Sequence, residues 1–292
     1  MKTYFILTVG ICIIIGGCAS SRSIRGVNKD LALQKEQQIE LMKPIEALDK
    51  KREEKWLKGE LDEKTDSISR NYIRQLKDSI ESRLNRFNVL GDKEFLRTNK
   101  KEAMVYLNSV GALYKKELEN LLIFDDLFST TTFSRLNTAA FFAPGKYQLN
   151  DSSITKARLM MDEIIKDAQG FSSKYNSKKL KAMFIVMGYA DEEDIATGSD
   201  LYKDLATSIS SSSPERKQLN AELSTRRAVS IKNILKSEYE LLSARTAASN
   251  LSVDFLAMGK GEQLPGGDNK DYRSVDERRR VVLLYWSIVP EL

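Results

Sequence analysis

Two long stripes of apolar residues, spaced by three or four positions, constrain the fold of the first half of the chain. One stripe consists of Ile68, Tyr72, Leu76, Ile80, Leu84 and Phe87. The second consists of Ala103, Leu107, Val110, Tyr114, Leu118 and Leu121. This spacing places the apolar side chains on one face of a helix. Gly91-Asp92 lies between the stripes and predicts a helix stop followed by a capping residue, so we expect an antiparallel helical hairpin.

The residues before the first stripe predict a third helix over positions 30–42, ending at Pro44. The whole region 29–128 is rich in Lys, Glu, Leu and Gln and shows almost no strand pattern. Stripes of this kind form a core in most proteins, and otherwise dock a partner or a second copy. We therefore expect a helical hairpin or bundle that serves as a spacer or as a module for protein partners or self-association.

The pattern changes after Phe128. Phe141, Phe142, Tyr147 and Leu149 flank Pro144-Gly145, and a helical pattern follows that includes Leu159, Ile164, Ile165 and Ala168. Apolar runs at 181–187, 251–257 and 280–288 predict strands, and a helix is expected from about Asn220 to Tyr239. The order β-α-β-α-β-β implies an α+β domain over residues 129–292, with helices on one face of a mixed sheet.

The N-terminus has the layout of an export signal. Lys2 is its only charge before an apolar run over residues 4–15, and small residues then precede Cys18. The run is shorter than the roughly 20 residues of a membrane-spanning helix. Ile15-Gly16-Gly17-Cys18 resembles the lipobox of bacterial lipoproteins, which implies a signal peptide at 1–17 and a lipid anchor on Cys18; the alternative is an ordinary signal with a chance cysteine. Residues 18–28 are then a lipidated tether.

Composition excludes several kinds of chemistry. The chain of 292 residues contains no histidine and two cysteines, Cys12 and Cys18. Serine–histidine catalysis, cysteine–histidine catalysis and histidine-ligated zinc are therefore excluded. Lys and Arg total 46 and Asp and Glu total 41, which is not the strongly basic footprint of a nucleic-acid-binding protein. We expect neither an enzyme nor a cofactor or metal, although a carboxylate-only or serine–lysine mechanism stays open.

Four short blocks in the second half carry a family resemblance. They are Gly188-Tyr189-Ala190-Asp191, the segment from Asn220 through Leu223-Ser224 to Arg227-Ala228, Gly259-Lys260-Gly261-Glu262 with Pro265, and Arg279-Arg280-Val281. In this order they resemble the OmpA C-terminal-like family of peptidoglycan-binding domains. The resemblance covers about residues 141–290 and does not extend to the helical half.

The resemblance implies a binding site for diaminopimelate of the peptidoglycan stem peptide, with Asp191 and Arg227 as its grip and Asn220 and Arg279 as support. The chemistry agrees, because the free end of diaminopimelate carries an ammonium and a carboxylate on one carbon. Asp191 offers the anion, and the planar guanidinium of Arg227 can hold a carboxylate through two hydrogen bonds. A helix start near Asn220 would add backbone amides. Each of the four residues also has a purely structural alternative, as a turn, cap or surface pair.

The sequence departs from the family pattern at several points. Tyr189 and Ala190 replace the usual His and Thr, Asp194 stands where a glycine commonly follows the aspartate, and Arg278 replaces an Asn. The insertion 192–219 is longer than usual, and either closes over the ligand or blocks it. The acidic run 191–194 raises calcium as a rival ligand, but it lacks the spacing of a calcium loop.

The sequence therefore predicts a lipoprotein that tethers the outer membrane to the cell wall, facing the periplasm, with no nucleic-acid partner. An alternative is a scaffold lipoprotein of an envelope-spanning apparatus whose OmpA-like domain has lost its ligand. A third is a cell-wall hydrolase that uses paired carboxylates.

Overall fold

The structure is a computed structural model that describes residues 23–130, 133–137, 142, 146–211, 213–243, 250–265 and 271–291. The predicted signal peptide and Cys18 lie outside these residues. The chain divides into two compact units, one formed by Met1–Met42 and Lys77–Glu117 and the other by Lys43–Leu76 and Leu118–Leu292. Among the described residues, no helix combines the length and the apolar character needed to cross a membrane.

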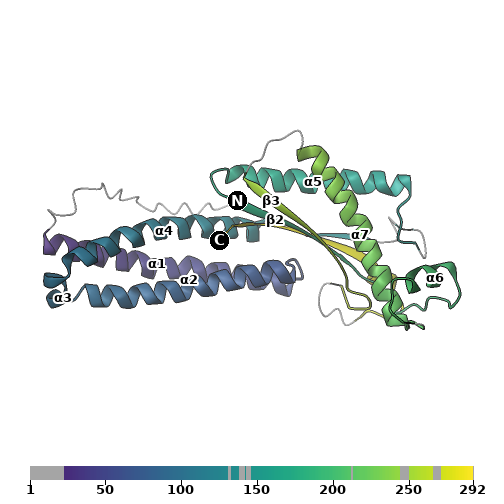
Figure 1. Ribbon diagram of the computed structural model, residues 1–292, viewed down its shortest axis with the longest axis horizontal. Coiled ribbons are helices and arrows are strands. Elements are labelled where there is room, and N and C mark those ends of the chain that lie inside the picture. Colours follow the sequence, from purple (N-terminus) through teal and green to yellow (C-terminus); the bar gives the residue numbers. More distant parts are fainter. Residues whose placement is uncertain are drawn as a thin grey trace. The chain divides into compact units, whose positions relative to one another are not determined.

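Helices dominate residues 24–129, as the apolar stripes predicted (Figure 1). They are Ile24–Leu57 (α1), Glu63–Leu90 (α2), Lys93–Thr98 (α3) and Lys100–Ser129 (α4). The break at Gly91-Asp92 is confirmed, because α2 ends just before it and the Asp92 side chain accepts from the backbone N–H groups of Glu94 and Phe95. In the first unit, these helices surround a buried cluster of Val27, Leu31, Phe87, Leu90, Leu96, Ala103, Met104, Leu107 and Val110.

Helix α1 corrects two predictions. It begins at Ile24, so the last residues of the expected tether are helical, and it continues through Pro44 instead of ending there. The buried positions explain the continuation: Leu41, Ile45 and Leu48 follow one another at steps of four and three and are almost inaccessible. Pro44 lies beside this stripe and is only partly buried, so apolar burial on one face maintains the helix despite the missing N–H.

The second half forms the predicted α+β arrangement. Its helices are Asp151–Lys174 (α5), Asp200–Ala206 (α6) and Arg216–Ser243 (α7), and its strands are Phe133–Asn137 (β1), Leu180–Gly188 (β2), Leu251–Gly259 (β3) and Val281–Pro290 (β4). The sheet order is β1-β4-β2-β3, with β2 and β3 parallel and the other pairs antiparallel. The mixed sheet is therefore confirmed. Two details differ from the prediction. Strand β1 precedes the aromatic stretch around Pro144, at a position where no strand was predicted. Leu159 of α5 is exposed rather than buried.

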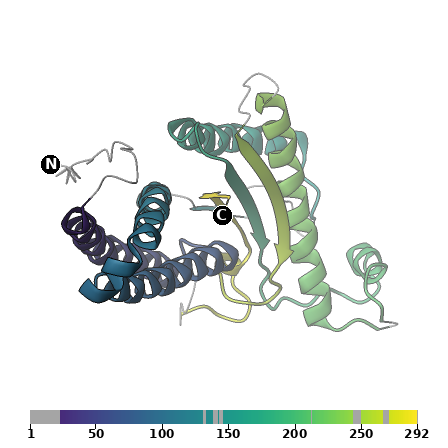
Figure 2. The ribbon, with the colours of Figure 1, turned by 60° about the vertical axis from the view of Figure 1, so that its left-hand side comes forward.

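The helices of this domain lie on one face of its sheet, as expected, and residues of the preceding helical region lie against the other face. On one face, α5 and α7 lie against the strands (Figure 2), with Phe171 edge-on to Trp286 and Tyr239 close to Phe184. On the other face, Tyr285 donates to the carbonyl of Gly59 at 3.0 Å, and the hydroxyls of Thr65 and Ser287 are 2.8 Å apart. Neighbouring residues of β4 thus point to opposite helical layers, which explains why the whole strand is buried.

Candidate functional site

The four sequence blocks meet at one end of the sheet. Strands β2 and β3 are parallel and end at the paired residues Gly188 and Gly259, beside the start of β4. Helix α7 crosses these ends so closely that a Cβ on Gly188 would lie 2.1 Å from the carbonyl oxygen of Ser224, and one on Gly259 would lie 2.1 Å from Oγ1 of Thr225. Only glycine permits this approach, which brings α7 onto the loops that follow both strands.

Asp191 follows β2 and is 4% exposed. Its Oδ2 accepts from Nη2 of Arg280 at 2.8 Å and from the backbone N–H of Asp276 at 3.1 Å. Within the described part of the chain, no donor forms a hydrogen bond with its Oδ1. The carboxylate is therefore oriented by one cation and one amide, and one oxygen is left for a further donor.

Arg227 lies on α7 and is 7% exposed. Its Nε donates to the carbonyl of Lys146 at 3.2 Å, and its guanidinium lies 5.7 Å from the ring centre of Phe142. Its terminal nitrogens form no hydrogen bond, and the group forms no ion pair, with any described residue. Burial lowers the pKa of Arg227 to about 10; the positive charge of Arg280 acts in the same direction and Asp191 in the opposite one. Among the described residues, no anion contacts this guanidinium directly, although the charge of Asp191 acts on it.

Asn220 and Arg279 bind the loops rather than point toward a ligand. The side-chain amide of Asn220 donates to the carbonyls of Asp191 and Glu193 and to the carboxylate of Glu262, at 3.0, 3.2 and 2.9 Å. Helix α7 begins at Arg216, one turn earlier than predicted, so the backbone amides near Asn220 lie inside the helix and the proposed helix-start contribution to the site is wrong.

Arg279 is 3% exposed and belongs to the short turn Glu277–Arg279 ahead of β4. It donates to the carbonyls of Ser274 at 2.9 Å and Glu262 at 2.5 Å, and to the carboxylate of Glu192 at 3.0 Å. These bonds connect the loops that follow β2 and β3 to the segment before β4. Both predicted supporting residues therefore have a visible structural task around Asp191.

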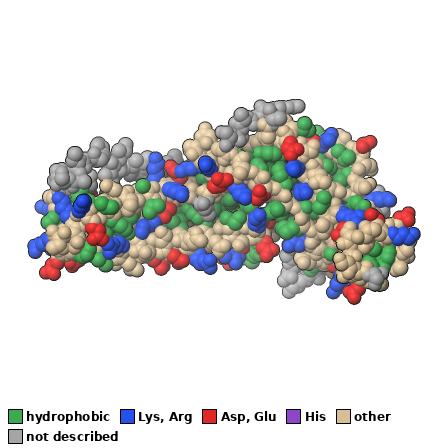
Figure 3. All heavy atoms as spheres, in the orientation of Figure 1, with side chains coloured by type: hydrophobic (Ala, Val, Ile, Leu, Met, Phe, Trp, Pro, Cys, Tyr) green, Lys and Arg blue, Asp and Glu red, His purple; other side chains and the backbone are tan. Residues whose placement is uncertain are grey.

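Three residues of the acidic run, Asp191, Glu192 and Glu193, form ion pairs with arginines. Asp191 and Glu193 both pair with Arg280, and Glu192 pairs with Arg279 and Arg216. The hydrogen bond from Arg279, together with the nearby positive charges, lowers the pKa of Glu192 below the usual value. Among the described residues, no three Asp, Glu, His or Cys side chains come together as a metal site. On the face drawn in Figure 3, blue and red side chains are also interspersed.

The insertion 192–219 is folded against α7. Leu205 and Leu219 pack with Leu223 of α7, and Tyr147, Ile195, Leu201, Tyr202 and Ile209 surround them. Arg226 holds this structure by donating to the carboxylate of Asp204 at 2.7 Å and to the hydroxyl of Ser208 at 2.7 Å. No described residue of the insertion forms a hydrogen bond or ion pair with Arg227.

Sequence reasoning missed the part of Arg280, which is the direct partner of Asp191, and of Arg216, which pairs with Glu262 at 3.0 Å. Arg280 and Glu262 stand within the quoted blocks, so the signal was present. The ion pairs Arg280–Asp191 and Arg216–Glu262 could not be predicted from the sequence, because they depend on how the loops pack against one another.

Comparison with known proteins gives matches only among solved structures. No protein-family model matches the chain, and no curated protein matches it. The OmpA-like domain of FopA1 from Francisella tularensis is 17% identical, with 54% of this chain and 72% of that chain covered and a TM-score of 0.26. A putative MotB-like protein from Desulfovibrio vulgaris is 16% identical, with 53% and 72% covered and a TM-score of 0.26.

A third similar structure is the periplasmic domain of Helicobacter pylori MotB. It is 17% identical, with 53% of this chain and 81% of that chain covered and a TM-score of 0.31. TM-scores of this size carry no information about function. The functional proposal therefore rests on the geometry of the site.

Proposed function

We propose that this chain binds peptidoglycan non-covalently by holding the free end of diaminopimelate between Asp191 and Arg227. The observation that carries the proposal is the state of Arg227, a buried guanidinium whose terminal nitrogens form no hydrogen bond with any described residue. A buried charge without a partner is costly, and binding sites are where such a cost is tolerated. A ligand carboxylate would supply the missing anion through two parallel hydrogen bonds.

Asp191 supplies the second half of the recognition. Its Oδ1 accepts no hydrogen bond from the described residues, while Oδ2 is fixed by Arg280 and Asp276. An ammonium group on the same carbon as the carboxylate would donate to Oδ1. The two groups together select a zwitterionic amino-acid end over a simple carboxylate or a simple amine.

The meeting of the four sequence blocks supports the resemblance to the OmpA C-terminal-like family. Asp191, the Asn220–Arg227 segment, Glu262 and Arg279 lie in one hydrogen-bonded network, although they are distant in sequence. The remaining parts of the proposal rest on the sequence: a lipid anchor at Cys18, a position on the periplasmic side of the outer membrane, and a helical region that serves as a spacer or partner-binding module. The protein would tether membrane and cell wall without catalytic turnover.

A second candidate is a scaffold lipoprotein that has lost ligand binding. The ion pair between Asp191 and Arg280 favours it, since a cation already occupies one carboxylate oxygen at 2.8 Å. Tyr189, which replaces the usual histidine, is also buried and donates toward Met187 rather than toward a ligand.

Co-sedimentation of the full chain, purified in detergent, with diaminopimelate-containing sacculi tests the proposal. We expect the parent and Arg74→Ala, an exposed arginine of α2, to sediment with sacculi. Asp191→Ala and Arg227→Ala should stay in solution with unchanged circular dichroism. Fluorescent sacculi in the same tubes report any soluble fragments, whose release would favour the hydrolase.

Failure of the folded parent to sediment would overturn the proposal and favour the scaffold. Binding of the parent that both variants retain would place the site elsewhere.

A further inference from the structure

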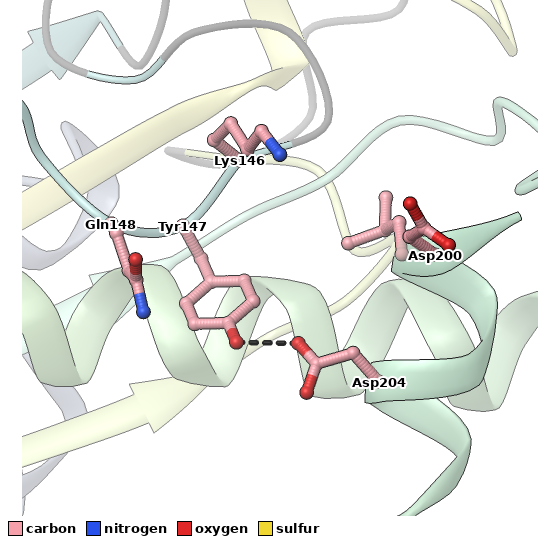
Figure 4. Close-up of a pocket in the computed structure, with 6 residues that line it drawn as sticks. Lys146, Tyr147, Gln148, Asp200 and Asp204 are labelled. Atoms are coloured by element: carbon pink, nitrogen blue, oxygen red, sulfur yellow. Dashed lines mark hydrogen bonds between the residues drawn. The ribbon is translucent and has the colours of Figure 1, made fainter.

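A surface pocket lies between the segment before α5 and helix α6 of the insertion (Figure 4). Its volume is about 200 Å³, and Lys146, Tyr147, Gln148, Asp200, Leu201 and Asp204 line it. This is smaller than the roughly 300–1,000 Å³ of pockets that enclose a drug-sized ligand. It suits a short piece of a larger molecule whose other part is bound nearby.

One wall of the pocket is fixed. The Tyr147 hydroxyl donates to the carboxylate of Asp204, and Arg226 donates to the same carboxylate while lying 4.9 Å from the ring centre of Tyr147. Ser230 also donates to the Tyr147 carbonyl at 2.7 Å. Tyr147 and α6 are thereby attached to α7, and the pocket is built before any ligand arrives.

Three polar groups that line the pocket are available to a ligand as far as the described residues are concerned. The ammonium of Lys146, the carboxylate of Asp200 and the amide of Gln148 form no hydrogen bond or ion pair with any described residue. Figure 4 shows Lys146 and Asp200 on opposite sides of the opening. Leu201 adds an apolar surface to the lining. The pocket thus offers a cation for a carboxylate, an acceptor for an N–H group, and an apolar contact for a small side chain.

The pocket is directly connected to the diaminopimelate site. The carbonyl of Lys146 accepts from Nε of Arg227. Lys146 therefore lines the pocket and also contacts Arg227 of the proposed diaminopimelate site. Arg226 and Arg227, neighbours on α7, hold the pocket wall and the proposed ligand, respectively. A peptide whose diaminopimelate lies at Arg227 has this pocket within reach of its next residues.

We infer that the pocket is a second subsite, which takes the alanines that follow diaminopimelate in the stem peptide. The terminal carboxylate binds the Lys146 ammonium, the peptide N–H donates to Asp200, and the methyl groups contact Leu201 and the Tyr147 ring. This inference rests on the proposed function and deepens it. The insertion 192–219 supplies Asp200, Leu201 and Asp204, so it extends the site instead of blocking it.

Three synthetic stem peptides, titrated into the full chain by calorimetry, test the subsite. One ends at diaminopimelate, one continues by two D-alanines, and one is the longer peptide with its terminal carboxylate amidated. We expect the longer acid to bind about fivefold more tightly than the short peptide, because a solvent-accessible ion pair and a small apolar contact are added. The amide should lose most of this gain.

Two lysine variants separate the subsite from the grip. Lys146→Ala, which keeps the backbone carbonyl that accepts from Arg227, should bring the affinity ratio of the longer acid to the short peptide to about one, whereas Lys156→Ala, an exposed lysine of α5, should leave this ratio at the parent's value. Equal binding of short and long peptides to the parent would overturn the subsite while the proposed function stands. If no peptide binds the folded chain, both proposals fall.

Discussion

Arg226 and Arg227 are consecutive residues of α7 in opposite electrostatic situations. Burial lowers the pKa of Arg226, but hydrogen bonds with Glu222, Asp204 and Tyr147 outweigh it, and the pKa is raised above the usual value. For Arg227, burial dominates and the pKa falls to about 10. The first guanidinium therefore contributes to the fold. The second is retained at a cost to the fold, which is expected of a group that serves a ligand.

Replacement of Arg227 should stabilise the protein. We expect Arg227→Met to raise the free energy of unfolding by about 1–2 kcal/mol, because a similar apolar volume replaces a buried charge. Binding to sacculi should be lost in the same variant. Urea unfolding followed by circular dichroism measures the first effect and co-sedimentation the second.

Arg226→Met is the matched control. It should lower the free energy of unfolding by about 1–2 kcal/mol, because it removes the hydrogen bonds that the guanidinium donates to Asp204, to the Tyr147 hydroxyl and to Ser208. Equal destabilisation by both variants would show that Arg227 is an ordinary structural residue.

The sequence could identify Asp191, Arg227, Asn220 and Arg279 as a group but not their separate tasks. Position in a motif selects a residue type, whereas the task depends on which loop carbonyls and carboxylates lie within hydrogen-bond distance. Arg279 donates to backbone carbonyls of two segments that precede it, and no spacing rule predicts those contacts. The ion pair between Arg280 and Asp191 could not be predicted for the same reason.

At the scale of helices, apolar periodicity predicted the stripes and the Gly91-Asp92 break, while rules about single residues failed. Pro44 was taken as a helix end, although the cost of about 3 kcal/mol for an interior proline is smaller than the gain from burying Leu41, Ile45 and Leu48 together. The effect of a single helix-breaking residue can therefore be judged only together with the apolar burial of its neighbours in the tertiary core.

Helices α1, α2 and α4 share a buried polar contact that sets their register. Arg83 donates to Gln38 at 2.8 Å and, through both terminal nitrogens, to Glu117 at 2.8 Å. We expect Glu117→Leu to lower the free energy of unfolding by about 3–5 kcal/mol, because it leaves a buried guanidinium without its anion. The double variant Arg83→Met/Glu117→Leu should recover most of this loss in urea unfolding.

The exposed pair of Lys51 and Asp125 provides the comparison, with side chains 43% and 50% exposed. Asp125→Ala should cost less than about 1 kcal/mol. A double variant of Arg83 and Glu117 that is no more stable than Glu117→Leu alone would contradict a charge-based explanation.

Asp62 makes the turn between α1 and α2 sensitive to pH. The residue is buried, its Oδ1 accepts from the backbone N–H of Thr65 at 2.9 Å, and burial raises its pKa despite hydrogen bonds that act in the opposite direction. The folded state therefore binds the proton more tightly than the unfolded chain, and stability falls as pH rises from the unfolded pKa through the folded one. Asp62→Asn keeps the acceptor and removes the charge.

We expect Asp62→Asn to be about 1–2 kcal/mol more stable than the parent at neutral pH, with the difference vanishing toward pH 4. Urea unfolding between pH 4 and pH 8 measures this difference. Asp92→Asn, the same exchange at the exposed start of α3, is the control. An advantage of Asp62→Asn that does not depend on pH would rule out titration of Asp62 as its cause.

At the scale of the whole molecule, the sequence predicted a boundary between a helical region and an α+β domain at 128/129. The contacts of β4 cross that boundary. Tyr285 donates to Gly59, and Ser287 shares a hydrogen bond with Thr65, so residues of the α1–α2 connection cover the face of the sheet that lies opposite α5 and α7. Sequence patterns could not show this, because an apolar strand looks the same whichever partner covers its second face.

A fragment comprising residues 129–292 should therefore be less stable than the intact chain. Without residues 59–66, the hydroxyls of Tyr285 and Ser287 lose these two hydrogen bonds and one face of β4 becomes exposed, so we expect a lower urea midpoint, binding of a hydrophobic dye and a tendency to associate.

A point variant of the intact chain tests one of these contacts alone. Thr65→Val should lower the free energy of unfolding by about 1–3 kcal/mol by leaving the buried Ser287 hydroxyl unbonded, and Thr65→Val/Ser287→Ala should restore much of this loss. A monomeric fragment with the stability of the full chain, and a double variant no better than the single one, would show that the predicted boundary separates two independent domains. Otherwise the α+β half depends on the α1–α2 connection for part of its stability, and the helical region is more than a spacer.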